Sequence, residues 1–147
     1  MSLFIKELHS ISLWVVLSGV RISSPHDIFA LVKGDFSNDS EKVELVMLDS
    51  MCNVLAKEIV SEGSENSAPL HPRQVLAVAL RYPTVFIVLV HNHPKGCVEP
   101  SEEDIEVTRK IAKAGKMVGV YLLDHLIIGN GKFFSFLQQG LISPSIR

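Results

Sequence analysis

The chain has 147 residues, of which 47% are hydrophobic, so it can bury one sizeable core and is too short for two ordinary domains. Fourteen Lys and Arg against sixteen Asp and Glu give a net charge of -2, which does not favour direct nucleic-acid binding, because such binding relies on excess positive charge. Cys52 and Cys97 are predicted to be free thiols, since a domain of this size needs no disulfide, and free thiols suit the reducing cytoplasm.

The most apolar part of the N-terminal region is residues 11–20, followed directly by Arg21. Ten residues are too few to cross a bilayer, which takes about 20, and no signal-peptide cleavage pattern follows them. We therefore expect residues 1–22 to form an arm or edge strand of one domain spanning residues 23–147, with no membrane association. An exposed strand edge can pair with a second copy, so a homodimer is compatible with the sequence.

The first half of the domain is predicted to be a helix followed by a hairpin. Ser24 followed by Pro25 is a typical helix start, and the apolar spacing after it predicts a helix that ends near Gly34. Residues 42–49 and 53–60 are β-rich runs separated by a short turn-compatible segment, which predicts an antiparallel hairpin.

The second half alternates helical and extended patterns. Residues 72–81 have helical spacing, and residues 84–90 form a continuous apolar, β-branched run typical of a central strand covered on both faces. A capping box predicts a helix over 101–115, and an Asn-Gly dipeptide predicts a hairpin of residues 117–129 and 132–136. The expected fold is a single α/β domain with a mixed β-sheet and helices on both faces.

His91 and His93 directly follow the predicted central strand. Residues two apart in extended backbone project to the same side, so both imidazoles can reach one point. Asp104 lies at the start of the next predicted helix, on the face that also carries Ile105 and Thr108. A carboxylate bordering the core needs compensation, which a divalent cation held by two neutral histidines provides. The sequence therefore predicts that His91, His93 and Asp104 bind a metal.

Two histidines and one carboxylate are typical ligands of a catalytic zinc ion. Three protein ligands leave a fourth tetrahedral position for water, whereas structural zinc sites are normally closed by four. Zinc lowers the pKa of such a water toward about 7 and polarises a carbonyl. We therefore expect one Zn²⁺ per chain and hydrolysis by zinc-activated water.

Hydrolysis also needs a group that moves protons, and the sequence offers three candidate glutamates. In the predicted strand over 53–60, Glu58 alternates onto the same face as Ala56, where burial raises the pKa of a carboxyl group. Periodicity alone does not separate Glu58 from Glu62 or Glu65.

The arrangement of Glu58, His91, His93, Ser101 and Asp104 resembles the signature of the JAMM or MPN-plus metalloproteases. Within that group, residues 20–142 are most similar to RadC-like proteins. The segments that carry this likeness are Ser23-Ser24-Pro25, His71-Pro72-Arg73, His91-Asn92-His93-Pro94 with Gly96, Glu99-Pro100-Ser101, Leu123-Asp124-His125-Leu126-Ile127-Ile128-Gly129 and Ser135-Phe136.

The resemblance implies a three-layer fold like that of cytidine deaminases, with zinc on His91, His93 and Asp104. It also implies that Glu58 is the general acid/base and that Ser101 helps to stabilise the tetrahedral intermediate. JAMM relatives cleave peptide or isopeptide bonds, so the implied partner is a peptide or protein substrate. RadC-like proteins also carry an association with DNA repair, whose biochemical basis the resemblance does not explain.

Two other functions compete with hydrolysis of a peptide-type bond. Nucleobase deamination uses a similar fold but requires His-x-Glu and Pro-Cys-x-x-Cys elements, which this sequence lacks. A RadC-like DNA-repair accessory or recruitment module would hold a mainly structural zinc ion. Replacing the general acid/base distinguishes this module from an enzyme, because only an enzyme would lose turnover.

Three further residues lie near the predicted site in the sequence. Asp124 and His125 are adjacent in a predicted strand and so point to opposite faces, and one of them is predicted to hydrogen-bond a zinc ligand. Cys97 lies in the loop after His93, but its spacing fits no ligand pattern.

Overall fold

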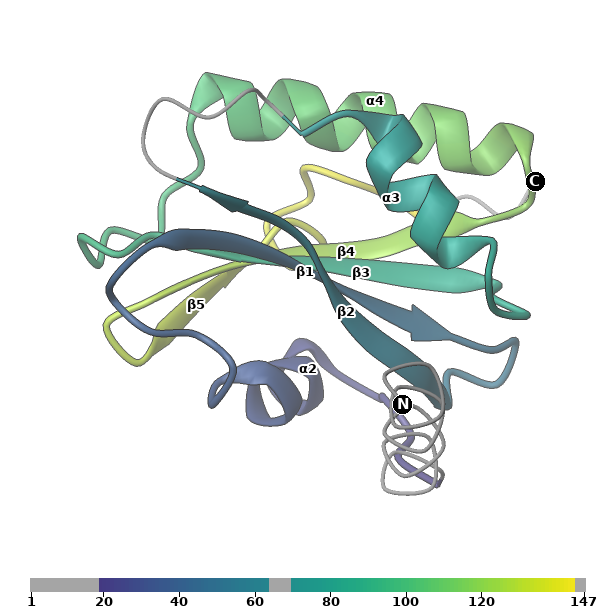
Figure 1. The fold of residues 1–147 in the computed structure, drawn as a ribbon, viewed down its shortest axis with the longest axis horizontal. Helices are drawn as coiled ribbons and strands as arrows, with labels where there is room; N and C mark the ends of the chain where they lie inside the picture. The colour runs from purple at the N-terminus through teal and green to yellow at the C-terminus, as the bar shows by residue number, and fades with distance from the viewer. Residues whose placement is uncertain (1–18, 64–69, 145–147) are drawn as a thin grey trace, which may run out of the picture.

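The computed structural model describes residues 19–63 and 70–144, which fold around one five-stranded sheet with strand order β2-β1-β3-β4-β5 (Figure 1). The order of elements along the chain matches the predicted alternation of helices and strands. They are α2 (Pro25–Val32), β1 (Glu41–Leu48), β2 (Val54–Gly63), α3 (Pro72–Ala79), β3 (Phe86–Asn92), α4 (Glu102–Met117), β4 (Tyr121–Gly129) and β5 (Lys132–Ser135).

The sheet is mixed, as predicted. β3 and β4 are parallel, whereas the pairs β1–β2, β1–β3 and β4–β5 are antiparallel. All seven residues of β3 are buried, which confirms the central strand expected from its continuous apolar run. The strand runs to Asn92 rather than stopping at residue 90, so His91 lies inside the sheet.

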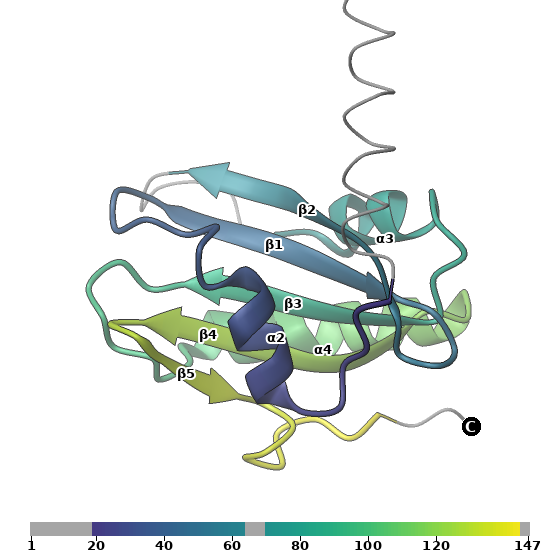
Figure 2. The same cartoon turned by 90° about the horizontal axis from the view of Figure 1, so that it is seen from below.

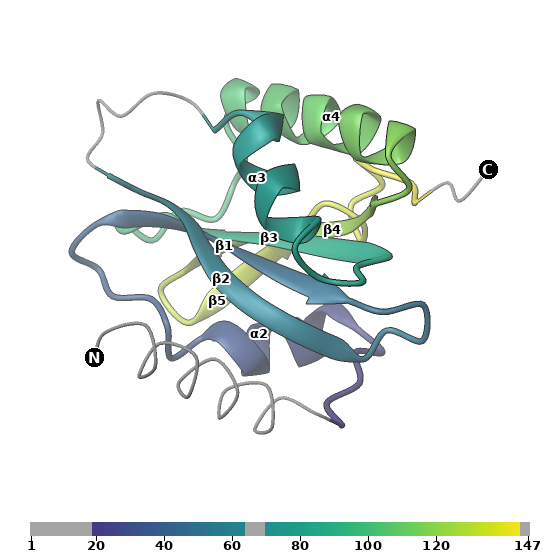
Figure 3. The same cartoon turned by 45° about the vertical axis from the view of Figure 1, so that its right-hand side comes forward.

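Helices cover both faces of this sheet. α3 and α4 lie on one face, and α2 lies on the other (Figures 1 and 2). Turning the molecule shows the same three layers, with the sheet between α4 and α2 (Figure 3). Strand alternation divides the core accordingly. Val46 and Val88 pack on the α2 side, and Leu45 and Leu89 pack on the α3 and α4 side.

Two helices begin at the serines that the sequence indicated. Ser24 and Ser101 are the N-caps of α2 and α4, and each forms a capping box with the acidic residue three positions later. The prediction that the last helix ends at Gly115 is wrong, because α4 continues to Met117. Gly115 instead allows the backbone of Val120 to lie close against α4, since a Cβ at residue 115 would be 2.3 Å from the carbonyl oxygen of Val120.

The two predicted hairpins are both present. β1 and β2 turn through Cys52, whose φ of 62° is left-handed, and β4 and β5 turn through Asn130 and Gly131, at φ 51° and 72°. The predicted arm or edge strand over residues 1–22 lies mostly outside the described residues. Of the helices within the described ranges, none combines the length and apolarity that crossing a bilayer requires.

Candidate metal centre

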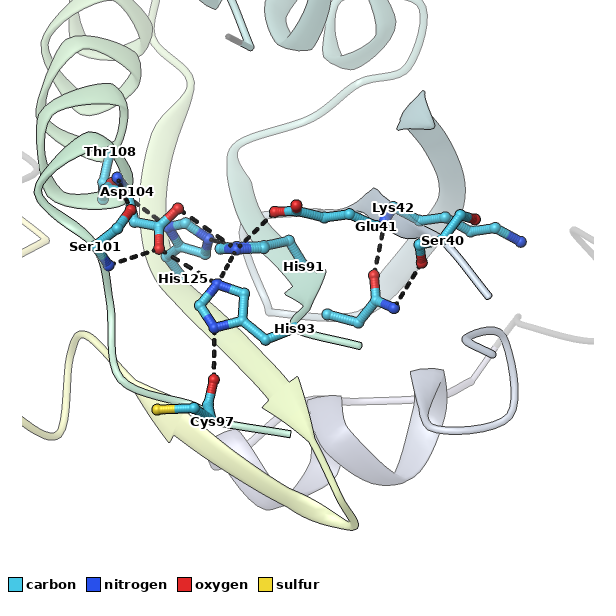
Figure 4. Close-up of polar contacts among 11 residues, drawn as sticks. Ser40, Glu41, Lys42, His91, His93, Cys97, Ser101, Asp104, Thr108 and His125 are labelled. Carbon is cyan, nitrogen blue, oxygen red and sulfur yellow. Dashed lines mark hydrogen bonds and ion pairs between the residues drawn. The ribbon is translucent and has the colours of Figure 1, made fainter. Parts of the chain in front are cut away.

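Four polar side chains from three elements meet at one end of the sheet (Figure 4). His91 lies in β3, His93 follows it, Asp104 lies in the first turn of α4, and Glu41 is the first residue of β1. His91 pairs with Val43 in the sheet, and Glu41 lies two residues before Val43 and so shares its face. The three predicted ligands are therefore brought together, and the structure adds Glu41 to them.

The distances among these groups are short. The Nε2 atoms of His91 and His93 lie 2.9 Å apart. One oxygen of Asp104 lies 3.4 Å from Nε2 of His91 and the other lies 3.4 Å from Nε2 of His93. Glu41 Oε1 lies 3.5 Å from Nε2 of His91. Glu41, His91 and His93 each offer one possible ligand atom, and these three atoms lie within 4.8 Å of one another.

The other ring nitrogen of each histidine fixes which tautomer the neutral ring adopts. Nδ1 of His93 lies 2.6 Å from the carbonyl oxygen of Cys97, and a carbonyl only accepts, so Nδ1 carries the proton. Nε2 of His93 therefore presents a lone pair to the cluster. The backbone of Cys97 supplies this contact, and its thiol plays no part in it.

His91 is oriented through a longer chain that passes through His125 and Thr108. The hydroxyl of Thr108 donates to the carbonyl oxygen of Asp104, so it accepts from Nδ1 of His125, 2.6 Å away. Nε2 of His125 is then an acceptor, and it takes a hydrogen bond from Nδ1 of His91 over 2.9 Å. Nε2 of His91 thus also presents a lone pair. The prediction that Asp124 or His125 hydrogen-bonds a predicted ligand is confirmed for His125, whereas Asp124 bonds Ser135.

This arrangement fits a small divalent cation. Two lone pairs 2.9 Å apart repel each other unless a proton or a cation lies between them. Ligands held about 2.0–2.1 Å from a tetrahedral zinc ion lie about 3.3–3.4 Å from one another. The separations of 3.4 Å between the Asp104 oxygens and the two rings are close to that spacing. The donor set of two imidazoles and one carboxylate also occurs in transition-metal sites, catalytic zinc sites among them.

The surroundings of His91 and Asp104 favour the protonation states that metal binding requires. Burial lowers the pKa of His91 to about 4, although the charge of Asp104 partly opposes the fall, and burial also holds the pKa of His125 well below its usual range. Burial opposes the ionisation of Asp104, yet the interaction with His93, the proximity of His91 and the hydrogen bond from the backbone of Ser101 keep its pKa below the usual value. The hydrogen bond with Asp104 raises the pKa of His93. At neutral pH His91 is neutral and Asp104 is ionised, as ligands must be.

Ser101 lies beside the cluster and holds Asp104 in place. Its Oγ accepts from the backbone N–H of Asp104 at 3.0 Å, while Oδ2 of Asp104 accepts from the backbone N–H of Ser101 at 2.8 Å. This reciprocal pair is the capping box of α4. The same bonds that start the helix therefore aim the Asp104 carboxylate at the histidines.

The structure does not bring Glu58 to this cluster. Both oxygens of Glu58 accept hydrogen bonds from Arg81, at 3.0 and 3.1 Å. Glu58 of β2 pairs with Leu45 of β1, and Leu45 pairs with Leu89 of β3. Glu58 is therefore two strands away from β3 and offset by two residues from His91, which puts their Cα atoms about 12 Å apart. The alternation argument placed it on the correct face of the sheet but not at the site. Its position therefore does not fit the predicted acid/base role.

The other two glutamates considered from the sequence do not replace it. Glu62 forms an ion pair with Lys42 at 3.5 Å, and Glu65 lies outside the described residues. Sequence reasoning missed Glu41 because the first strand was expected to begin one residue later, at Lys42. The alternation of β1, in which Glu41 shares a face with Val43, is a signal that could have identified it. For Thr108 the sequence predicts only a helix residue that faces inward.

Two cavities adjoin the cluster on either side of His93. One has a volume of about 520 Å³ and contains Glu41 in its wall, and the other has a volume of about 320 Å³. The walls of the larger one are formed by Asp39, Ser40, Glu41, Gly63, His93, Pro94, Lys95 and Cys97. A small molecule can therefore reach His93 from the surface.

Comparison with known proteins identifies the family. Residues 22–141 match the family model described as RadC-like JAB domain. The chain is 42% identical over 124 residues to a UPF0758 protein of Desulforamulus reducens, and 40% identical over 123 residues to one of Methanosarcina mazei. These matches cover 84% and 83% of this chain but 55% and 54% of the relatives, so the chain spans about half their length. JAB domains are associated with metal-dependent hydrolases. This chain belongs to the RadC-like JAB domain family.

Proposed function

We propose that this domain is a zinc-dependent hydrolase of peptide or isopeptide bonds, with the metal held by His91, His93 and Asp104. The observation that carries the proposal is the convergence of two histidine lone pairs, 2.9 Å apart, with a carboxylate 3.4 Å from each. A bound zinc ion supplies a Lewis acid that polarises a carbonyl and makes water acidic enough to attack near neutral pH. The family match supports hydrolysis in general, and the peptide bond is our more specific inference.

Glu41 is the residue that we assign as general acid/base. Its Oε1 lies 3.5 Å from His91 Nε2, and the side chain is 45% exposed, so it faces both the cluster and the larger cavity. In the proposed reaction a Glu41 oxygen accepts a proton from the attacking water and then delivers it to the leaving nitrogen. We do not assign this role to Glu58, because its carboxylate is bonded to Arg81 and its Cα atom lies about 12 Å from that of His91.

Ser101 is the residue to which we assign a second role in the same reaction. Its Oγ already accepts from the backbone N–H of Asp104, which leaves the hydroxyl hydrogen to donate elsewhere. We infer that this hydrogen bonds the oxygen of the substrate carbonyl as negative charge develops on it. Ser101 would then serve two purposes, since it caps α4 and stabilises the tetrahedral intermediate.

The test combines metal analysis with cleavage of a peptide library by the wild type and two matched variants. Glu41→Gln should keep the zinc content of the wild type and lose about 10²–10⁴-fold in turnover, because it removes only the proton-transfer group. Glu58→Gln is the control and should retain turnover. A recruitment module would bind zinc without cleaving any peptide, and an enzyme that uses Glu58 would show the reverse ranking of the two variants. Either result would refute the proposal.

A further inference from the structure

We propose that Asn92, the residue between the two histidine ligands, is a positioning residue that holds Glu41 at the metal centre. The inference rests on the proposed function, because it concerns how the acid/base group is aimed. Asn92 is 4% exposed, and its side chain lies on the face opposite to that of His91. It therefore points away from the metal, toward the segment that leads into β1.

The amide of Asn92 makes three hydrogen bonds to that segment. Oδ1 accepts from the backbone N–H of Lys42 at 2.7 Å, and Nδ2 donates to the carbonyl oxygens of Ser37 and Ser40 at 3.1 and 2.9 Å. Both amide hydrogens and one oxygen lone pair are thus used. The contacts with Ser40 and Lys42 bracket Glu41 on both sides. Figure 4 shows the Glu41 side chain extending toward His91, with Ser40 and Lys42 beside it in the chain.

The clamp lies where β1 is paired on one side only. Glu41 pairs with Gly63 of β2, but the backbone pairing of β1 with β3 ends at Val43 and His91, so no backbone pair joins Glu41 to β3. Residues 33–40, which precede Glu41, form neither helix nor strand. The side-chain amide of Asn92 makes hydrogen bonds to this segment where backbone pairing between β1 and β3 has ended. Because it belongs to the same three-residue stretch as His91 and His93, it couples the position of Glu41 to that of two metal ligands.

A clamp of this kind predicts that Asn92 acts through Glu41 and not through the metal. Asn92→Asp keeps the size of the side chain but turns two N–H donors into lone pairs that face two carbonyl oxygens. The three metal ligands do not depend on these bonds. Zinc affinity should therefore stay close to that of the wild type, while the attachment of residues 40–42 weakens.

The experiment uses the full chain and measures zinc affinity, amide hydrogen exchange at Lys42, and turnover. Asn92→Asp keeps an acceptor for the Lys42 N–H, but its carboxylate repels the carbonyl oxygens of Ser37 and Ser40, so the segment should shift and exchange at Lys42 should speed up by about tenfold. Asn92→Asp should reduce turnover by about 10–100-fold without a matching rise in KM, as expected when a reacting group is displaced. In the Glu41→Gln background the same substitution should add no further loss. Asn53→Ser removes a side-chain hydrogen bond at the far end of β1 and is the control, with turnover unchanged.

Three results would overturn the clamp. They are unchanged exchange at Lys42, a loss of turnover that adds to that of Glu41→Gln, and a loss of zinc that explains the lower turnover. If Asn92→Asp does not fold, Asn92→Ser removes all three bonds without adding charge and carries the test. If the wild type cleaves no peptide, the proposed function fails separately. The clamp is then judged by exchange at Lys42 and by the side-chain ¹⁵N shifts of His91, which Asn92→Asp and Glu41→Gln should alter alike.

Discussion

Replacing Glu44 with glutamine should stabilise the protein at neutral pH. Glu44 is 3% exposed on the α2 side of β1, and its Oε2 has no hydrogen-bond partner among the described residues. Burial, and then the negative charge of Asp35 and a hydrogen bond with it, raise the pKa of Glu44 to about 8, and Lys57 only partly opposes the rise. At pH 7 the carboxyl group is therefore protonated in the folded protein and ionised in the unfolded chain, which makes unfolding easier.

The size of the effect follows from the two pKa values. The ordinary pKa is 4.5 and the folded value is about 8, so the cost is absent below pH 4.5, grows up to about pH 8 and is constant above. At pH 7, which is 2.5 pH units above the ordinary pKa of 4.5, ionisation of Glu44 in the unfolded chain lowers the free energy of unfolding by about 3 kcal/mol. Glutamine is neutral at every pH and keeps an N–H donor for Asp35. The Glu44→Gln protein should be more stable by about 3 kcal/mol at pH 7 and equal to the wild type near pH 4.5.

Urea unfolding at several pH values between 4.5 and 8, with chelator present so that metal binding does not contribute, measures this difference. Glu62→Gln provides the control, because that side chain is 59% exposed and its replacement should change stability by less than about 0.5 kcal/mol. The reasoning is refuted if Glu44→Gln is less stable than the wild type at pH 7. It is equally refuted if the gain does not vary with pH.

Two further substitutions test the metal centre and the packing of α4. Thr108→Val removes the acceptor of His125 Nδ1–H, so the tautomer that exposes Nε2 of His91 is no longer favoured, and zinc affinity measured against a competing chelator should fall about 10–100-fold. Thr108→Ser keeps the hydroxyl and should bind zinc normally. Equal zinc affinities for the two variants would contradict the proposed series of hydrogen bonds from Thr108 through His125 to His91. Gly115→Ala should lower the free energy of unfolding by about 1–3 kcal/mol, because its Cβ would lie 2.3 Å from the Val120 carbonyl oxygen, and an unchanged urea midpoint would argue against this contact.

The features that sequence reasoning predicted correctly depend on short stretches of chain. Serine caps, the Asn-Gly turn and the continuous apolar run of β3 each act within a few residues, so α2, the β4–β5 hairpin and the central strand could be located. The pairing of His91 with His93 needs only the two-residue period of a strand. Asp104 could be added because one capping box sets both the start of α4 and the direction of its carboxylate.

The acid/base residue could not be located in this way. Both Glu41 and Glu58 lie on the face of the sheet that carries His91, so alternation treats them alike. What separates them is the strand order, in which β1 lies beside β3 and β2 lies one strand further out. The order depends on contacts between segments about 45 residues apart, which no local pattern encodes.

The sequence by itself determined most of the helices and strands and the three side chains that converge at the candidate metal centre, because periodicity and capping are properties of neighbouring residues. Only the tertiary structure decided which glutamate joins them, which tautomers His91 and His93 adopt and what holds residues 37–42 in place. Each of these depends on hydrogen bonds or strand pairs between distant parts of the chain, and these exist only once the sheet has formed.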